Sequence, residues 1–333
     1  MRQFVLGVLG LGLAAAPLVA QSHTLIVLSH RNHMAYELDP ESGKVLHEYE
    51  APDQPHEATV SPDGKRIFLA VPQGPVVEIL EGETMKRIGR IESPEFKRTP
   101  VQTQNGMNSN AAPHGIAITE DGNKVYVGLE NADVPGVVVI DPKAGKVVKK
   151  IELLLQGGHY LAIQPGTGKL YYPHRDDNRV VVLDTKTDKI LRIVPVKGGP
   201  VGVAFRPNGE VWLHEDGDGS VTVLDKTDAV VQVIPTGGQG AGRIAVSPDG
   251  RYAASTHGGT QDVAIIDTDK RAVAATVQLG RGPGFPLFSP DSSKLYVLNS
   301  GSGDVAVIDM KTRAVTARYK VGTDPFGGFV KTR

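Results

Sequence analysis

Ser247-Pro-Asp-Gly250, followed by Val263-Ala-Ile-Ile-Asp267, is the pattern that decides the fold, because it recurs along most of the chain. A turn of this type precedes an apolar, β-branched run, and an acidic residue closes the run. Fixed-period self-similarity is the sequence signature of a repeat architecture. Seven closing acids are spaced 42, 60, 43, 41, 42 and 42 residues apart: Asp39, Glu81, Asp141, Asp184, Asp225, Asp267 and Asp309.

Each repeat supplies four short strands. After the closing acid comes a turn such as Pro142-Lys-Ala-Gly-Lys146 and then another β-branched run such as Val147-Val-Lys-Lys-Ile151. Helical periodicity is absent after residue 20. A single four-stranded sheet cannot bury both of its faces, whereas seven sheets stacked radially around a channel can. The sequence therefore predicts an all-β fold, a seven-bladed β-propeller with four strands per blade.

The two ends of the repeat array predict how the ring closes. The array begins near Thr24 with a second-type strand, and no innermost strand precedes it. It ends with Pro325-Phe-Gly-Gly-Phe-Val-Lys331, which matches the innermost-strand onset Pro55-His-Glu-Ala-Thr-Val-Ser61. We therefore expect the C-terminal strand to complete the N-terminal blade, which removes open sheet edges.

The first twenty residues differ from the rest. Arg2 precedes an apolar run from Phe4 to Val19, which is too short to span a bilayer and is interrupted by glycines and a proline. We interpret residues 1–20 as a secretory signal peptide cut after Ala20. Residues 21–333 are then a single propeller domain of an exported protein, periplasmic or extracellular.

Composition excludes several classes of function. The full chain has 36 basic and 37 acidic residues, and removal of Arg2 with the signal peptide changes the net charge from −1 to −2. That balance argues against a nucleic-acid partner and against insertion into or capture by a membrane. The chain has no cysteine, so disulfides, thiolate metal ligands and a cysteine nucleophile are excluded.

Tyr296-Val-Leu-Asn-Ser300, followed by Val305-Ala-Val-Ile-Asp309, resembles the YVTN-repeat β-propeller family of exported bacterial and archaeal proteins. The resemblance extends over all seven repeats of the mature chain and implies a seven-bladed propeller. It carries little information on function, because fold does not fix function. Proteins of this general architecture include cell-surface scaffolds, lactonases, a haem-carrying nitrite reductase domain and the propeller of nitrous oxide reductase.

Most of the ten histidines map to one predicted face, at or near the channel mouth. One set lies at the start of three consecutive innermost strands. A second set lies at the end of the second strand of a blade, where the family resemblance places asparagine. The first set is His56, His114 and His159, and the second is His174, His214 and His257, with Asn299 at the equivalent position of the last repeat.

A hairpin predicted over residues 156–174 brings one histidine of each set together. Its turn, Pro165-Gly-Thr-Gly168, has the residues that a tight turn requires. If the turn is centred between its second and third residues, His159 lies directly opposite His174. Opposed residues of an antiparallel pair share a face, with Cβ atoms about 5 Å apart. We therefore expect these two imidazoles to bind one ligand.

Charged and polar neighbours gather at the same predicted face. The interval between Glu81 and Asp141 is 18 residues longer than the usual 42, and the extra residues lie around the polar stretch Thr99 to Ala112, which is expected to form a long loop there. Imidazoles with carboxylate support suit Zn, Cu, Fe or Ni. The predicted metal ligands are His56, His114, His159, His174, His214 and His257, and the predicted additional ligand-binding residues are Glu57, Glu130, Arg175 and Asn299.

Three interpretations of function remain open at this point. The exported propeller binds a small molecule or a transition metal at a histidine-lined funnel. Alternatively, the same histidines serve a hydrolase, such as a lactonase, a lyase or an oxidoreductase, as general acid and base. In the third, the propeller is a scaffold for a protein partner and its histidines are structural, with His174 and His257 replacing the asparagine of the repeat.

Overall fold

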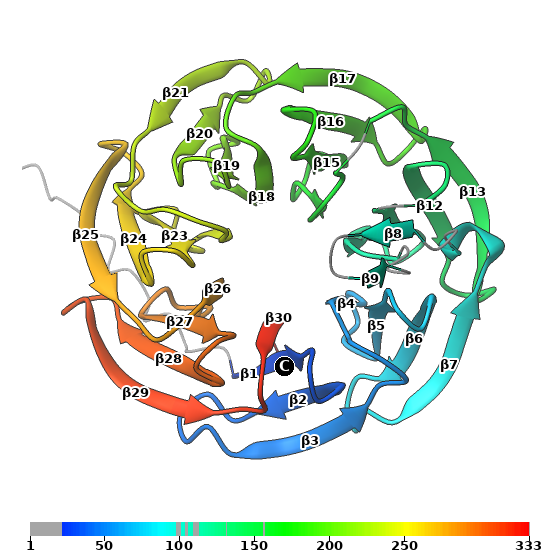
Figure 1. Ribbon diagram of the computed structural model, residues 1–333, viewed down its shortest axis with the longest axis horizontal. Helices are drawn as coiled ribbons and strands as arrows, with labels where there is room; N and C mark the ends of the chain where they lie inside the picture. The colour runs from blue at the N-terminus through cyan, green and yellow to red at the C-terminus, as the bar shows by residue number, and fades with distance from the viewer. Residues whose placement is uncertain are drawn as a thin grey trace, which may run out of the picture.

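The computed structural model describes residues 22–97, 101–103, 106–108, 113–130, 132–155 and 157–332. In these ranges, seven four-stranded antiparallel sheets stand around a central axis, as the view in Figure 1 shows. The prediction of an all-β, seven-bladed propeller with four strands per blade is confirmed.

Each blade runs from an innermost strand beside the axis to an outermost strand at the rim (Figure 1). From the axis outward, blades 1 to 4 consist of β30 (Pro325–Thr332), β1 (His23–Ser29), β2 (Met34–Leu38) and β3 (Val45–Glu50); β4 (Glu57–Val60), β5 (Arg66–Val71), β6 (Val76–Glu81) and β7 (Arg87–Glu92); β10 (Ile116–Ile118), β11 (Val125–Leu129), β12 (Gly136–Asp141) and β13 (Lys146–Glu152); and β14 (Ala162–Ile163), β15 (Lys169–His174), β16 (Arg179–Asp184) and β17 (Lys189–Pro195).

The remaining three blades follow the same order. Blades 5 to 7 consist of β18 (Pro200–Phe205), β19 (Val211–Glu215), β20 (Val221–Leu224) and β21 (Val230–Ile234); β22 (Ile244–Val246), β23 (Tyr252–His257), β24 (Asp262–Asp267) and β25 (Ala272–Gln278); and β26 (Pro283–Phe288), β27 (Lys294–Asn299), β28 (Asp304–Asp309) and β29 (Ala314–Lys320).

Side-chain hydrogen bonds explain why the turn motif recurs between the first and second strands. In blade 6, Ser247 Oγ donates to Asp249 Oδ1 at 2.6 Å and accepts the backbone N–H of Tyr252 at 3.0 Å. Gly250 then adopts a φ of 71°, a left-handed conformation that glycine takes without a steric penalty. The motif therefore closes its turn locally and sets the register of the hairpin.

The closing acids cap the turn between the third and fourth strands. Asp141, for example, accepts the backbone N–H groups of Lys143 and Ala144 at 2.8 and 3.0 Å. These bonds hold the pKa of Asp141 below its ordinary value. The regular spacing of these acids is thus a consequence of turn geometry and carries no information about a ligand.

The apolar core lies in the seams between blades. Seven clusters of buried side chains occur among the described residues, each formed by two neighbouring sheets. Between blades 3 and 4, Tyr126 and Val137 pack against Leu170 and Val181. Each sheet thus buries both faces against its neighbours, which leaves the axial ends of the strands for function.

The C-terminal strand closes the ring, as predicted. β30 pairs antiparallel with β1, beginning with His23 opposite Thr332. Lys331 Nζ lies 2.5 Å from Glu37 Oε1 and donates to the carbonyl of Gly82 at 2.6 Å. A buried ion pair of this kind fixes the last strand to both the first and the second blade.

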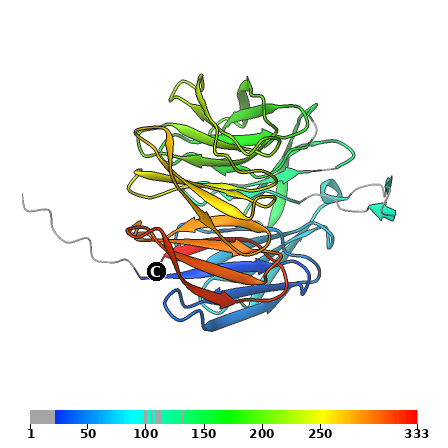
Figure 2. The same cartoon turned by 60° about the vertical axis from the view of Figure 1, so that its left-hand side comes forward.

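The long insertion between blades 2 and 3 contains secondary structure that was expected to be absent. A 3₁₀ turn, η1 (Pro94–Phe96), is followed by the antiparallel strands β8 (Val101–Thr103) and β9 (Gly106–Asn108). Figure 2 shows this small hairpin standing away from the ring. The rest of the stretch 99–112 lies outside the described residues.

No helix within the described ranges is long and apolar enough to cross a bilayer. The predicted signal peptide, residues 1–20, lies outside those ranges.

Candidate functional site

Four imidazole rings form a continuous row, which we call the axial cluster: His30, His56, His114 and His159. Successive ring centroids along the row are 4.6, 3.8 and 4.5 Å apart. The rings come from blades 1, 2, 3 and 4, so residues spread over 130 positions of the sequence meet at one place. The structure thus brings His56, His114 and His159 together as expected, and it adds His30 from the connection after β1.

The backbone determines where these rings lie. The N–H groups of His56, His114 and His159 each donate to a carbonyl of the next strand, at 2.9, 3.0 and 3.0 Å. Each histidine is therefore anchored just before its innermost strand begins. Gly115 allows blades 3 and 4 to approach, because a Cβ atom there would lie 2.6 Å from the carbonyl oxygen of His159.

Two carboxylates flank the His114 ring of the cluster. His114 Nδ1 lies 3.7 Å from Glu57 Oε1, and its Nε2 lies 3.0 Å from Glu130 Oε2. Two overlapping groups of potential metal ligands result, each with donor atoms within 4.8 Å of one another: His56, Glu57 and His114 in the first, and His114, Glu130 and His159 in the second.

Hydrogen bonding favours the first group. Where the imidazole is neutral, the close contact with Glu130 places the ring proton of His114 on Nε2 and leaves the Nδ1 lone pair facing Glu57. His159 Nδ1 lies 3.0 Å from Arg243 Nη2. A guanidinium can only donate, so this lone pair of His159 is already occupied. His114 Nδ1 is the nitrogen available to a metal.

Burial sets the protonation states of the cluster. Desolvation lowers the pKa of all four imidazoles, with like charges adding to the effect, and for His30 the pKa falls to about 4. Burial also raises the pKa of Glu57 to about 8, against the opposing influence of Arg243. The rings are therefore neutral near pH 7, the form that ligates metals.

Several buried donor atoms of the first group have no partner among the described residues. The Nδ1 atoms of His56 and His114 make no hydrogen bond. Both oxygens of Glu57, whose side chain is 4% exposed, lack a hydrogen bond of good geometry, although the backbone N–H of Ile116 is near enough to lower the pKa of Glu57 slightly. Buried polar atoms are normally paired, so their convergence here indicates a place for a ligand.

Arg243 is the member of the site that the sequence interpretation missed. It comes from blade 6, yet its guanidinium contacts His159 of blade 4 and lies 5.9 Å from the ring centroid of Phe326 of blade 1. Such contacts across the ring place it on the axis. The signal was available, because Arg243 occupies the repeat position of Glu57, one residue after the histidine position.

The predicted pairing of His159 with His174 is wrong. Ala162 pairs with Tyr171 in the register expected for the hairpin, but the next bridge joins Gly158 to His174. The register has slipped by one residue, which moves a side chain to the other face of the sheet. His159 consequently faces the axis, whereas the His174 ring packs against the Tyr172 ring with centroids 4.5 Å apart.

His257 and Asn299 have the same local role in their blades. His257 Nδ1 lies 2.8 Å from Asp262 Oδ1, and Asn299 Nδ2 donates to Asp304 Oδ1 at 2.7 Å. Both side chains are fully buried. They tie the end of the second strand to the start of the third, which is the structural role foreseen as the alternative for His257.

His214 is also away from the axial cluster. Its Nδ1 lies 2.9 Å from Ser255 Oγ, and its ring centroid is 5.7 Å from that of His257. The groups with metal-binding geometry in the described chain include none of His174, His214, His257 and Asn299. These residues therefore belong to the interior of blades 4 to 7.

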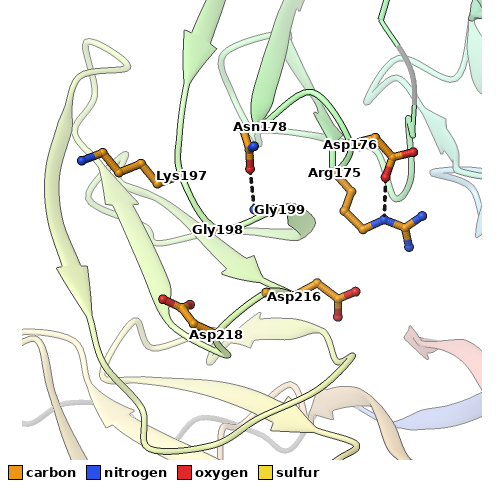
Figure 3. Close-up of a pocket in the computed structure, with 9 residues that line it drawn as sticks. Arg175, Asp176, Asn178, Lys197, Gly198, Gly199, Asp216 and Asp218 are labelled. Carbon is orange, nitrogen blue, oxygen red and sulfur yellow. Dashed lines mark hydrogen bonds and ion pairs between the residues drawn. The ribbon is translucent and has the colours of Figure 1, made fainter.

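Arg175 lines a neighbouring cavity of about 460 Å³ between blades 4 and 5. Figure 3 shows its guanidinium paired with Asp176, at 3.0 Å, while Asp216 extends from the next connection. Its charge still helps to lower the pKa of His114 and His159. Arg175 thus acts on the cluster at a distance and makes no ion pair with its carboxylates.

Fold and site together define the class: a seven-bladed β-propeller with histidines, two carboxylates and an arginine converging on its axis. No family model and no curated protein matches the chain, so membership of the YVTN-repeat family stays a prediction.

Solved structures similar to the chain share its fold. Hydrazine synthase from Kuenenia stuttgartiensis is 18% identical with a TM-score of 0.73, over 91% of this chain and 99% of that one. The periplasmic gluconolactonase PpgL of Pseudomonas aeruginosa is 17% identical with a TM-score of 0.73, over 93% and 99%. Apo AztD from Citrobacter koseri is 16% identical with a TM-score of 0.65, over 93% and 98%. At these identities the likeness extends to the fold alone.

Proposed function

We propose that this chain is an exported propeller that binds one divalent transition-metal ion at the axial cluster, through His56, Glu57 and His114. The observation that carries the proposal is the convergence of buried, unpartnered donor atoms in that group. Two imidazoles and a carboxylate suit Zn, Cu, Ni or Fe and do not suit Ca or Mg, which prefer oxygen ligands.

The residues around the three ligands support this assignment. Glu130 holds the His114 ring from the side opposite Glu57, as a carboxylate does for metal-bound histidines. His56 is held between the rings of His30 and His114. Two side chains that are not proposed ligands, Glu130 and His30, therefore help to hold the donor set in place.

Export is part of the proposal. It rests on the signal-peptide pattern in residues 1–20, and one of the similar propellers, PpgL, is named as periplasmic. Binding outside the cytoplasm agrees with the absence of cysteine, because an imidazole and carboxylate site is not lost when the surroundings are oxidising.

Isothermal titration of the metal-free protein with Zn²⁺ or Co²⁺ tests the site. We expect one ion per chain, with affinity lost in His114→Ala and lowered about 10–100-fold in Glu130→Gln. His257→Asn is the matched control, because Asn299 already serves the same structural role in blade 7. Equal affinity in His114→Ala and wild type would refute the proposal.

A second candidate is hydrolysis at the same ion. Three protein ligands leave a coordination position for water, as in catalytic zinc sites, and PpgL is named as a gluconolactonase. The test is turnover of simple lactones by the metal-loaded protein. Activity that disappears in His114→Ala and persists in His257→Asn supports a lactonase, whereas binding without turnover supports a metal-binding protein.

A further inference from the structure

Arg243 is a buried cation whose charge is not directly neutralised. Its side chain is 6% exposed, and its Nε atom has no partner among the described residues. Nη1 donates to the carbonyl of Gly242 at 2.9 Å and Nη2 lies 3.0 Å from His159 Nδ1. No carboxylate in the described ranges forms an ion pair with it at 4.0 Å or less. Burying a charge without such a partner is costly.

The fold does not require a cation at this position. Arg243 lies one position after the repeat position that holds His56, His114 and His159. The equivalent residues of the other blades are Glu57, Gly115, Tyr160, Gly202, Phe285 and Gly327. Arg243 is thus the basic residue among seven otherwise acidic, small or aromatic ones. Its stacking on Phe326 orients the guanidinium, and a neutral side chain of similar length could pack there equally well.

The charges at the site, summed with a metal ion bound, suggest a role for Arg243. The ion brings two positive charges and Arg243 one, while Glu57 and Glu130 bring one negative charge each and the imidazoles are neutral. The cluster then carries an excess of about one positive charge in a buried setting. Asp216 also acts on Arg243, but it forms no ion pair with it and is partly exposed beside the cavity in Figure 3.

The proposed metal ion has an open coordination position that a negatively charged ligand could occupy. His56, Glu57 and His114 are three ligands, and a tetrahedral ion takes a fourth. A cavity of about 270 Å³ adjoins the cluster and is lined by His30 and His56 of the cluster and by Phe326. Arg243 does not line this cavity, but its guanidinium lies 5.9 Å from the ring centroid of Phe326, and the His56 ring packs against the same phenylalanine at 5.1 Å. The guanidinium and one of the proposed metal ligands therefore share a neighbour.

We propose that the site takes a small carboxylate together with the metal, one oxygen completing the coordination of the ion and another accepting hydrogen bonds from Arg243. This inference rests on the proposed metal site and adds to it the class of the second ligand. A planar carboxylate matches the guanidinium fork better than a spherical anion does.

The experiment uses the full chain loaded with Co²⁺ and follows its visible spectrum during titration with malonate at constant ionic strength. Chloride replaces malonate in the control titration. We expect a saturable spectral change with malonate and a much weaker one with chloride. Arg243→Met keeps the bulk of the side chain without its charge and should need at least about tenfold more malonate while still binding Co²⁺. Arg243→Lys should lie between the two.

The outcomes separate this inference from the proposed function. If the wild type binds Co²⁺ but its spectrum ignores malonate, or if Arg243→Met responds like wild type, the carboxylate site is refuted and the metal site stands. If the wild type binds no Co²⁺, the metal site is refuted. The metal-free protein then tests Arg243 alone: malonate that raises the Tm of wild type and not of Arg243→Met supports anion binding, and no rise in either refutes it.

Discussion

Metal binding at pH 7 should release close to one proton, and this proton should come from Glu57. Burial raises the pKa of Glu57 to about 8, so the carboxyl is about nine-tenths protonated at pH 7. The imidazoles of the cluster are already neutral and have no proton to lose. A metal ligand must be deprotonated, so the ion displaces the proton of Glu57.

The pH dependence follows with a definite sign. Because the pKa of Glu57 is raised, the apparent affinity for the metal should fall about tenfold for each pH unit below 8, which is about 1.4 kcal/mol per unit. Above pH 8 the carboxylate is already ionised, so affinity should level off and proton release should approach zero. An exposed carboxylate would instead give a plateau from about pH 5 upward.

Calorimetric titration with Zn²⁺ in buffers of different ionisation enthalpy measures the released protons directly. Glu57→Gln should bind more weakly and release almost none at pH 7, whereas His257→Asn should release the same number as wild type. Proton release that is absent in wild type at pH 7, or unchanged in Glu57→Gln, would show that Glu57 is not a buried, protonated ligand.

Three further predictions concern the stability of the propeller. The metal-free protein should lose stability as the pH falls below about 6.5, by about 1.4 kcal/mol per pH unit for each cluster imidazole that is protonated only after unfolding. Urea titrations in the presence of a chelator at pH 7.5 and 5.5 measure this loss, and equal stability at the two pH values would contradict it. Truncation after Asp324 removes β30 and should cost much of the ~5–15 kcal/mol that typically stabilises a domain, so an unchanged Tm would disprove ring closure. His257→Ala should cost about 1–3 kcal/mol because Asp262 loses its partner, and His257→Asn less, by thermal unfolding; similar costs for the two would count against that role.

The fold could be predicted from sequence because each repeat carries its own turn chemistry. Ser247, Asp249 and Gly250 close one turn by local hydrogen bonds, and the same motif does so in other blades. Closure was predictable from the ends of the array for the same reason. The histidines at the starts of β4, β10 and β14 followed from repeat phase, since equivalent positions of a propeller meet at the axis.

The parts that failed depend on irregularities within single blades. β14 has only two residues, Ala162 and Ile163, so its ladder does not extend to His159, and the hairpin slips by one residue at Gly158. Alternation along a strand cannot reveal such a slip. Arg243 was not predicted because blade 6 has Gly242, and no histidine, at the repeat position occupied by His56, His114 and His159. Which ring nitrogen faces which carboxylate depends on packing between blades and could not come from sequence.

The most direct test of the account is the position of a bound ion. Crystals of the zinc-loaded protein, measured at the zinc absorption edge, should show one anomalous peak about 2.0–2.2 Å from a nitrogen of His56, a nitrogen of His114 and an oxygen of Glu57. A peak at His174, His214 or His257, or no peak at the axis of a zinc-saturated protein, would contradict the central claim.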